Sequence, residues 1–320
     1  MNILHEKSPC CQGKIRRFGG RRRQCVVCSR TWRVWKKKRG AKTKRTANQL
    51  LIKYLDNRCC PLRKPYLRAR TRKALEVFIQ KEKWAEIPSG QLIAIADAMV
   101  QRINRRVFTV YFILLKDNLS NKAVIAPPVL LTGSEDSFGW MKAFSSLPGD
   151  SQSRIVSLVC DGRTALVYLA QKSGWLVQRC HFHLRARISN YSSSFYLARH
   201  PEIGQKVNGL VTIVLTNKQQ KEVDGALDKL GSYRISLFSV GLRKVISGFV
   251  KNYTDYRTYL NYPELNLPTT TNSVESLIGT VREVQHRARG FSSVTSLEKW
   301  IISVLKYRKY QTCNGKYQPN

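Results

Sequence analysis

Three acidic residues stand at positions where a carboxylate is suited to binding a metal ion. Asp161 follows directly on the apolar, β-favouring run 155–160, and Asp97 lies inside a second apolar run, 92–100. Glu275 lies near the start of a helical pattern. A carboxylate at the end of a buried strand is unfavourable unless a metal or another cation balances its charge. The three positions therefore predict metal-dependent chemistry.

Carboxylates grouped in this way suit the hydrolysis of a phosphodiester. Two divalent ions about 4 Å apart activate the attacking hydroxyl and stabilise the leaving oxygen, and Mg²⁺ or Mn²⁺ prefers carboxylate ligands. Asp117 and Asp136 lie near Asp97 in the chain, but one follows a strand in a turn and the other lies in a Gly-Ser-Glu-Asp loop. Only Asp97 lies within an apolar strand pattern, so we expect it to be a ligand together with Asp161 and Glu275.

Glu275 also has a structural interpretation. An acid in the first turn of a helix is favoured by the helix dipole, and Asn272 or Ser273 is a suitable N-cap. Basic residues follow the predicted helix, and we interpret Arg287 and Arg289 as contacts to DNA phosphates.

A Cys-x-x-His motif, formed by Cys180 and His183, follows a short apolar strand pattern at 175–179. Such a pair can supply two zinc ligands, but a zinc site needs two more, and His181 is not expected to join them. We favour a structural or DNA-positioning role for the pair near the active site.

The cysteines near the N-terminus have the spacing of a zinc ribbon. Cys25 and Cys28 form a Cys-x-x-Cys knuckle, whereas the first knuckle has Ser8 where a cysteine would be expected. The alternative is a basic disordered arm with incidental thiols. The predicted zinc ligands are Cys11, Cys25 and Cys28, with Cys10 or His5 as the fourth.

The charge of the chain indicates a polyanionic partner. Lys and Arg number 56 against 20 Asp and Glu, a net charge of +36, and 42% hydrophobic residues indicate a folded body. Residues 1–45 hold 16 Lys and Arg and one acid, so the net charge of this segment is 16 − 1 = +15. We expect the phosphate contacts of this segment to be Arg21, Arg22, Arg23, Lys36, Lys37 and Lys38.

A membrane partner is not indicated, because no apolar run approaches about 18 residues and no signal-peptide pattern is present. We therefore expect an intracellular protein whose nine cysteines are metal ligands or buried thiols.

The order of the patterns predicts an α/β protein of six segments. The basic ribbon 1–45 precedes a helical segment 46–88, which is either a helix-turn-helix module or a linker with a solvated basic face. Segment 89–183 holds three strands, then helix, strand, helix and strand, the order of a ribonuclease-H-like core with a mixed five-stranded sheet. A helical insertion, 184–268, precedes the last helices, 269–310, and a polar tail, 311–320.

These motifs, in this order, resemble the Mutator-like insertion-sequence transposases with an Asp-Asp-Glu triad, most closely the variants with an N-terminal zinc-binding segment. The resemblance covers about residues 90–305, and the ribbon extends it to the N-terminus. It implies a ribonuclease-H-like catalytic domain interrupted by a helical insertion. The motifs that carry it are Asp97, Asp161-Gly162, Cys180-x-x-His183, Thr271-Asn272-x-x-Glu275 and Arg289-Gly290-Phe291.

The resemblance implies an enzyme that binds transposon ends, hydrolyses a phosphodiester and joins the free 3′ hydroxyl to target DNA. Its expected cofactors are Mg²⁺ or Mn²⁺ at the acids and Zn²⁺ at the ribbon. Its expected partners are terminal inverted repeats, target DNA and a second copy of the chain, in a prokaryotic cytoplasm at the nucleoid. The alternatives are a ribonuclease-H-like nuclease or resolvase, and a non-catalytic zinc-ribbon protein that only binds nucleic acid.

Overall fold

The computed structural model describes residues 7–19, 22–33, 46–58, 65–192, 201–236 and 240–313. The chain divides into two compact units, Met1–Thr46 and Ala47–Asn320. No helix in these described ranges is long and apolar enough to cross a membrane.

The first unit contains a small antiparallel sheet in the order β1-β2-β3, formed by Ile15–Arg17, Arg22–Cys25 and Thr31–Arg33. A close approach requires glycine at position 13, because a Cβ there would lie 2.6 Å from Cγ2 of Val27. The sheet and the turns beside it position the cysteines of this unit.

The second unit is built on a mixed sheet of seven strands. The strand order is β10-β6-β5-β4-β8-β9, and β7 pairs with β5 off this path. The antiparallel pairs involve β4, β5, β6, β7 and β10, whereas β4-β8 and β8-β9 are parallel. The strands are β4 Leu92–Ile103, β5 Arg106–Lys116, β6 Lys122–Ile125, β7 Val129–Thr132, β8 Ile155–Cys160, β9 Leu176–Arg179 and β10 Tyr310–Thr312. A mixed α/β fold is therefore confirmed.

The expected five-stranded sheet differs from the structure in two places. The run 123–131 is not one strand but two, β6 and β7, which flank Pro127 and Pro128 and pair with different parts of β5. Proline lacks the N–H that a continuous ladder needs. The prediction of a polar tail over 311–320 is also wrong at its start, because β10 pairs with β6 and Cys313 is buried. Residues 314–320 lie outside the described part of the chain.

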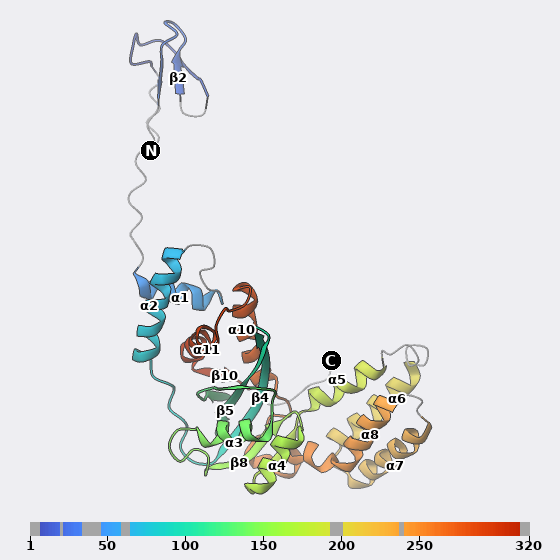
Figure 1. The fold of residues 1–320 in the computed structure, drawn as a ribbon. Coiled ribbons are helices and arrows are strands. Elements are labelled where there is room, and N and C mark those ends of the chain that lie inside the picture. Colours follow the sequence, from blue (N-terminus) through green and yellow to red (C-terminus); the bar gives the residue numbers. More distant parts are fainter. Residues whose placement is uncertain are drawn as a thin grey trace. The chain divides into compact units, whose positions relative to one another are not determined.

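Helices cover both faces of the sheet (Figure 1). Alternate residues of β4 point to opposite faces, so Ile93 and Ile95 join one core cluster and Leu92 and Ala94 join the other. The first cluster includes side chains of α10 (Asn272–Arg287) and α11 (Val294–Arg308). The second includes side chains of α3 (Ser137–Ser145) and α4 (Thr164–Lys172).

The two helices α1 (Ala47–Asp56) and α2 (Pro65–Lys81) share a small core with α10 and α11. Leu51 of α1 and Leu75 of α2 are buried there together with Trp300 of α11. These helices therefore pack against α10 and α11 and belong to the same compact unit.

Between β9 and α10 the chain is helical, with a core of its own. Its elements are α5 His181–Ser192, α6 Pro201–Thr216, α7 Gln220–Ser236, α8 Val240–Lys251, η2 Tyr253–Tyr256, α9 Thr258–Asn261 and η3 Pro263–Leu265. The end of this segment is tied to β9, since the Gln178 amide donates to the carbonyl of Tyr256 at 3.1 Å and Thr258 donates to the carbonyl of Val177.

Candidate active site

Asp97 lies in β4, Asp161 directly follows the neighbouring parallel strand β8, and the two residues face the same side of the sheet. Ile95 of β4 pairs with Val159 of β8, so continuing both strands by two residues brings Asp97 level with Asp161. Ile95 and Val159 both belong to the core cluster beneath α10. Because side chains alternate along a strand, both carboxylates point to the face that α10 covers.

Asp97 is half-buried and lies within the electrostatic influence of two other carboxylates. Burial, and then the negative charges of Asp161 and Glu275, raise the pKa of Asp97 to about 6. The N–H of Ala98 donates to its Oδ1 at 2.8 Å, and this bond and the charge of His183 oppose the rise. A desolvated carboxylate beside two other carboxylates is stabilised by a cation.

Asp161 is oriented by the turn that follows β8. Gly162 has φ +84°, which favours glycine, and a Cβ there would lie 3.1 Å from Cδ of Arg179. In this turn the backbone N–H of Arg163 donates to Oδ1 of Asp161 at 2.9 Å. The Arg163 guanidinium lies 3.2 Å from Oδ2 of the same carboxylate. Asp161 keeps 10% of its side chain exposed.

Sequence reasoning missed Glu135 and Arg163. Nη1 of Arg163 lies 3.0 Å from Glu135, whose side chain is only 4% exposed, so the guanidinium links Glu135 to Asp161. Burial raises the pKa of Glu135, and hydrogen bonding from Trp140 and the charge of Arg163 oppose this. The sequence shows Glu135 and Asp136 side by side in a Gly-Ser-Glu-Asp loop. No local pattern indicates which of the two is linked to Asp161.

The two acids set aside in favour of Asp97 have local structural roles. Asp136 is the N-cap of α3 and accepts from the N–H of Gly139 at 2.7 Å. Asp117 accepts from the N–H groups of Leu119 and Ser120 in the turn after β5. Both carboxylates therefore stabilise turns or helix ends.

Glu275 lies in the first turn of α10, but the helix is not capped as expected. The N-cap position is Thr271, not Asn272 or Ser273, and its side chain does not cap the backbone. The Thr271 hydroxyl instead donates to Oε1 of Glu275 at 2.5 Å. Nδ1 of His183 lies 3.4 Å from the same oxygen. Thr271 and His183 therefore fix the position of the Glu275 carboxylate.

The Cys-x-x-His motif joins the end of β9 to the segment that leads into α10. Sγ of Cys180 accepts from the N–H of Thr271 at 3.3 Å and lies 3.2 Å from its hydroxyl. The contact with Cys180, and then the charges of Glu275 and Asp161, raise the pKa of His183 to about 9 against the effect of burial. His183 is thus a cation at neutral pH and balances part of the negative charge.

His181, between the two motif residues, belongs to the core. Its side chain is 3% exposed, and its Nε2–H donates to the carbonyl of Tyr256 at 2.7 Å. Burial lowers its pKa to about 4. Its backbone N–H also donates to Thr269 at 2.9 Å. His181 therefore anchors α5 and is directed away from the acids, as the sequence indicated.

Ligand atoms gather in two groups among the described residues. In the second unit, Cys180, His183 and Glu275 have ligand atoms within 4.8 Å of one another. Asp97, Asp161 and Glu275 do not form a group this tight. Their hard oxygen donors, set around a desolvated carboxylate, fit Mg²⁺ or Mn²⁺ better than Zn²⁺. The mixed group offers zinc only three ligands.

The second group is the cysteine cluster of the first unit: Cys10, Cys11, Cys25 and Cys28. The Cys10–Cys28 and Cys11–Cys25 sulfur pairs lie 3.2 Å apart, and Cys10–Cys11 3.9 Å. Sulfurs around a tetrahedral zinc lie about 3.8 Å apart, given Zn–S bonds of about 2.3 Å. The cluster is therefore compatible with zinc binding. Cys10 fills the position that was left open, and His5 lies outside the described residues.

The residues expected to contact DNA are only partly described. Arg22, Arg287 and Arg289 are exposed and Arg23 is half-buried. Arg287 also donates to the carbonyl of Asn57. The remaining expected contacts, Arg21, Lys36, Lys37 and Lys38, lie outside the described ranges.

No protein-family model matches the chain, and no curated protein sequence matches it. Among solved structures, the chain has a faint likeness to the crystal structure of NurA bound to dAMP and manganese, with 13% identity and a TM-score of 0.13. The match covers 82% of this chain and 61% of that one. A likeness of this size carries no argument about fold or function.

Proposed function

We propose that the chain is a DNA transposase of the Asp-Asp-Glu type, like the Mutator-like insertion-sequence enzymes that its sequence resembles. The observation that carries the proposal is the meeting of Asp97 and Asp161 on one face of the sheet, under the helix that bears Glu275. The net charge of +36 supports a polyanionic substrate.

The strand order supports a ribonuclease-H-like core. Strands β6-β5-β4 run antiparallel in sequence order, and β8 and β9 continue the sheet parallel to β4. This is the arrangement in which the first and fourth strands of the core are neighbours. The helical segment between β9 and α10 has the position that was expected for an insertion.

In this proposal each acid has a distinct task. Bound Mg²⁺ or Mn²⁺ supplies an activated hydroxyl and stabilises the leaving oxygen. Asp97 and Asp161 would hold the ions from the sheet, and Glu275 would complete the set from α10. Thr271 and His183 orient Glu275, while Arg163 orients Asp161.

The cysteine cluster supports a zinc-binding role for the first unit, with DNA as its partner. Zinc held by Cys10, Cys11, Cys25 and Cys28 would stabilise the turns beside β2, which bears the exposed Arg22 and the half-buried Arg23. The proposed partners are the element's terminal repeats and target DNA, and two copies of the chain hold two ends.

The test is a reaction of the purified chain with a DNA fragment that carries both ends of the surrounding element. With Mg²⁺ or Mn²⁺ we expect nicks at the element ends and joining of the 3′ ends to a target plasmid. A chelator abolishes both. Cleavage without joining would assign a nuclease or resolvase instead, and binding without cleavage would assign a non-catalytic DNA-binding protein.

A further inference from the structure

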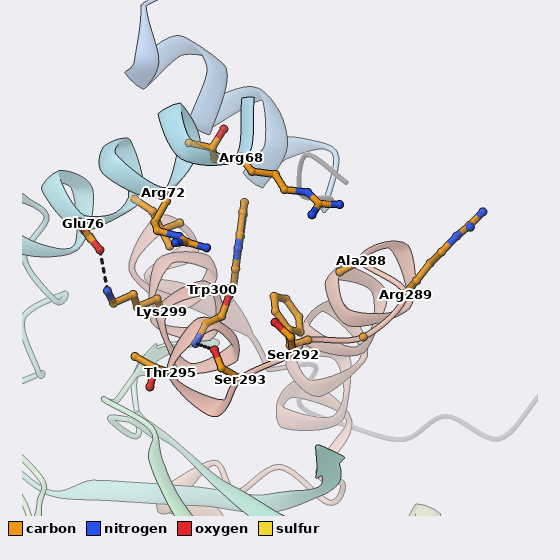
Figure 2. A pocket seen from close by; sticks show the side chains of 15 residues that line it. Arg68, Arg72, Glu76, Ala288, Arg289, Ser292, Ser293, Thr295, Lys299 and Trp300 are labelled. Atoms are coloured by element: carbon orange, nitrogen blue, oxygen red, sulfur yellow. Dashed lines mark hydrogen bonds and ion pairs between the residues drawn. The ribbon is translucent and has the colours of Figure 1, made fainter. Parts of the chain in front are cut away.

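A basic groove lies between α2 and the segment that joins α10 to α11 (Figure 2). It encloses about 790 Å³. Arg68 and Arg72 line it from α2, Arg289 from the turn after α10, and Lys299 from α11, with Trp300 also in its wall. None of Asp97, Asp161 and Glu275 lines it, so the groove is separate from the candidate active site.

The groove carries uncompensated positive charge. Its ionisable lining consists of four cations and one acid, Glu76, so the balance is 4 − 1 = +3. Glu76 is already paired with Lys299 at 2.7 Å. The three arginines are exposed and form no ion pair within 4 Å among the described residues, although the charge of Arg72 helps to lower the pKa of Glu76. Cations left without partners in a concave surface attract an anion.

Arg289 stands at the edge of the groove in an unfavourable backbone conformation, and its side chain extends outward (Figure 2). The N–H of Gly290 donates to Gln285 and that of Arg289 to His286, both at 3.0 Å, which is the double bond of a Schellman motif. In that motif the residue with positive φ is usually glycine, yet here it is Arg289, with φ 53°. A conformation of this kind persists where the surrounding structure imposes it, and here it places Arg289 beside the groove.

Uncharged donors line the same groove. Ser293 caps α11 by accepting from the N–H of Ser296, and the N–H of Thr295, which also lines the groove, has no partner in the described structure. Thr71 of α2 also lines the groove, is 1% exposed, and its hydroxyl lacks a hydrogen-bond partner among the described residues. Donors and arginines together suit a phosphate.

We propose that this groove binds the phosphodiester backbone of duplex DNA at a distance from the active site. The inference rests on the proposed function in that DNA is the partner, but not on the chemistry of the acids. Glu275 and Ala288, which lines the groove, are 288 − 275 = 13 residues apart along α10, or about 20 Å at 1.5 Å per residue. For DNA that runs along α10, this distance corresponds to about six nucleotides between the groove and the reacting phosphate, at about 3.4 Å per nucleotide.

The test compares DNA affinity as a function of salt for the full-length chain and three variants. Arg68→Ala with Arg72→Ala removes two groove cations, and Arg289→Gly removes the third. The control, Lys142→Ala with Lys172→Ala, removes two charges from α3 and α4 on the other face of the sheet. Binding is measured on duplex DNA by fluorescence anisotropy, with the melting temperature of each variant.

We expect the slope of log K against log salt to fall by about 0.9 for each phosphate contact removed, so by about 1.8 in the double variant and about 0.9 in Arg289→Gly. Arg289→Gly keeps or raises the melting temperature, because glycine is unstrained at this φ. The control keeps the slope of the parent. If the parent chain bound DNA and the groove variants kept its slope of log K against log salt, only the proposal that the groove binds DNA would be overturned. A parent that does not bind DNA would overturn both the groove and the proposed function.

Discussion

The hydroxyl of Thr271 donates a 2.5 Å hydrogen bond to Oε1 of Glu275 and lies 3.2 Å from Sγ of Cys180. Thr271 is fully buried, so this bond persists only if the end of β9 and the start of α10 keep their spacing. The Cys-x-x-His motif therefore acts on Glu275 through Thr271, and His183 contacts the same carboxylate.

Thr271→Val removes this hydroxyl at nearly constant volume. A hydrogen bond to a charged group contributes about 1.5–3 kcal/mol, so we expect strand cleavage to slow by about ten- to a hundredfold. DNA affinity is unchanged, because Thr271 is buried, and Thr271→Ser restores most of the rate. Single-turnover cleavage measures the effect. A Thr271→Val chain with the parent rate would mean that Glu275 is positioned without Thr271.

Zinc content tests the cysteine cluster. We expect the purified full-length chain to contain about one zinc per molecule, as four ligands around one ion require. Cys25→Ser replaces a buried ligand and loses the metal, while Cys160→Ser, in β8, retains it. Metal analysis by mass spectrometry reports both values. A parent chain free of zinc, purified without chelator, would contradict the assignment.

His181 makes stability depend on pH. Burial lowers its pKa to about 4 from an ordinary 6.5, so the folded state resists the protonation that the unfolded state accepts. The neutral His181 therefore places no penalty on folding above pH 6.5. As the pH falls from 6.5 to 4, the free energy of unfolding decreases by up to about 3 kcal/mol. Urea titrations at pH 7 and pH 4.5 measure it. His181→Gln should lower the free energy of unfolding at pH 7 but remove this part of its pH dependence. If the free energy of unfolding depended on pH equally in the parent and in His181→Gln, the role of His181 would be refuted.

Gly162 and Gly174 form a matched pair for testing the turn at Asp161. Both have positive φ, but only at Gly162 would a Cβ meet another residue, Arg179. We expect each change to alanine to cost about 1 kcal/mol of stability. Gly162→Ala should also slow cleavage, since the turn places Asp161, whereas Gly174→Ala should cleave at the parent rate. Equal cleavage rates for Gly162→Ala and Gly174→Ala would mean that the placement of Asp161 by this turn does not affect cleavage.

Much of the sheet was predictable because its signals are local. The apolar runs around Asp97 and before Asp161 identified β4 and β8, whereas the register that puts both acids on one face comes from the pairing of these strands. The break at Pro127 and Pro128 was also visible, but which part of β5 each half would join depends on tertiary pairing.

Other parts of the site arise only from contacts between distant segments. The link of Glu135 to Asp161 runs through Arg163, and 135 and 163 are far apart in sequence. Similarly, Arg68 and Arg289 meet in one groove because α2 packs against α11, which no periodicity in either segment indicates. Single-sequence patterns predict faces of elements, not which faces meet.

The most direct test of the central claim compares Asp161→Asn with Asp136→Asn in paired cleavage and gel-shift assays on DNA that carries the element's ends. Both changes remove one negative charge at constant volume. Asparagine still caps α3 at position 136, whereas at position 161 it removes a metal ligand. We predict that Asp161→Asn lowers cleavage by at least about a hundredfold with DNA binding retained, because metal catalysis contributes several kcal/mol, and that Asp136→Asn cleaves like the parent. Parent-level cleavage by Asp161→Asn would contradict the account.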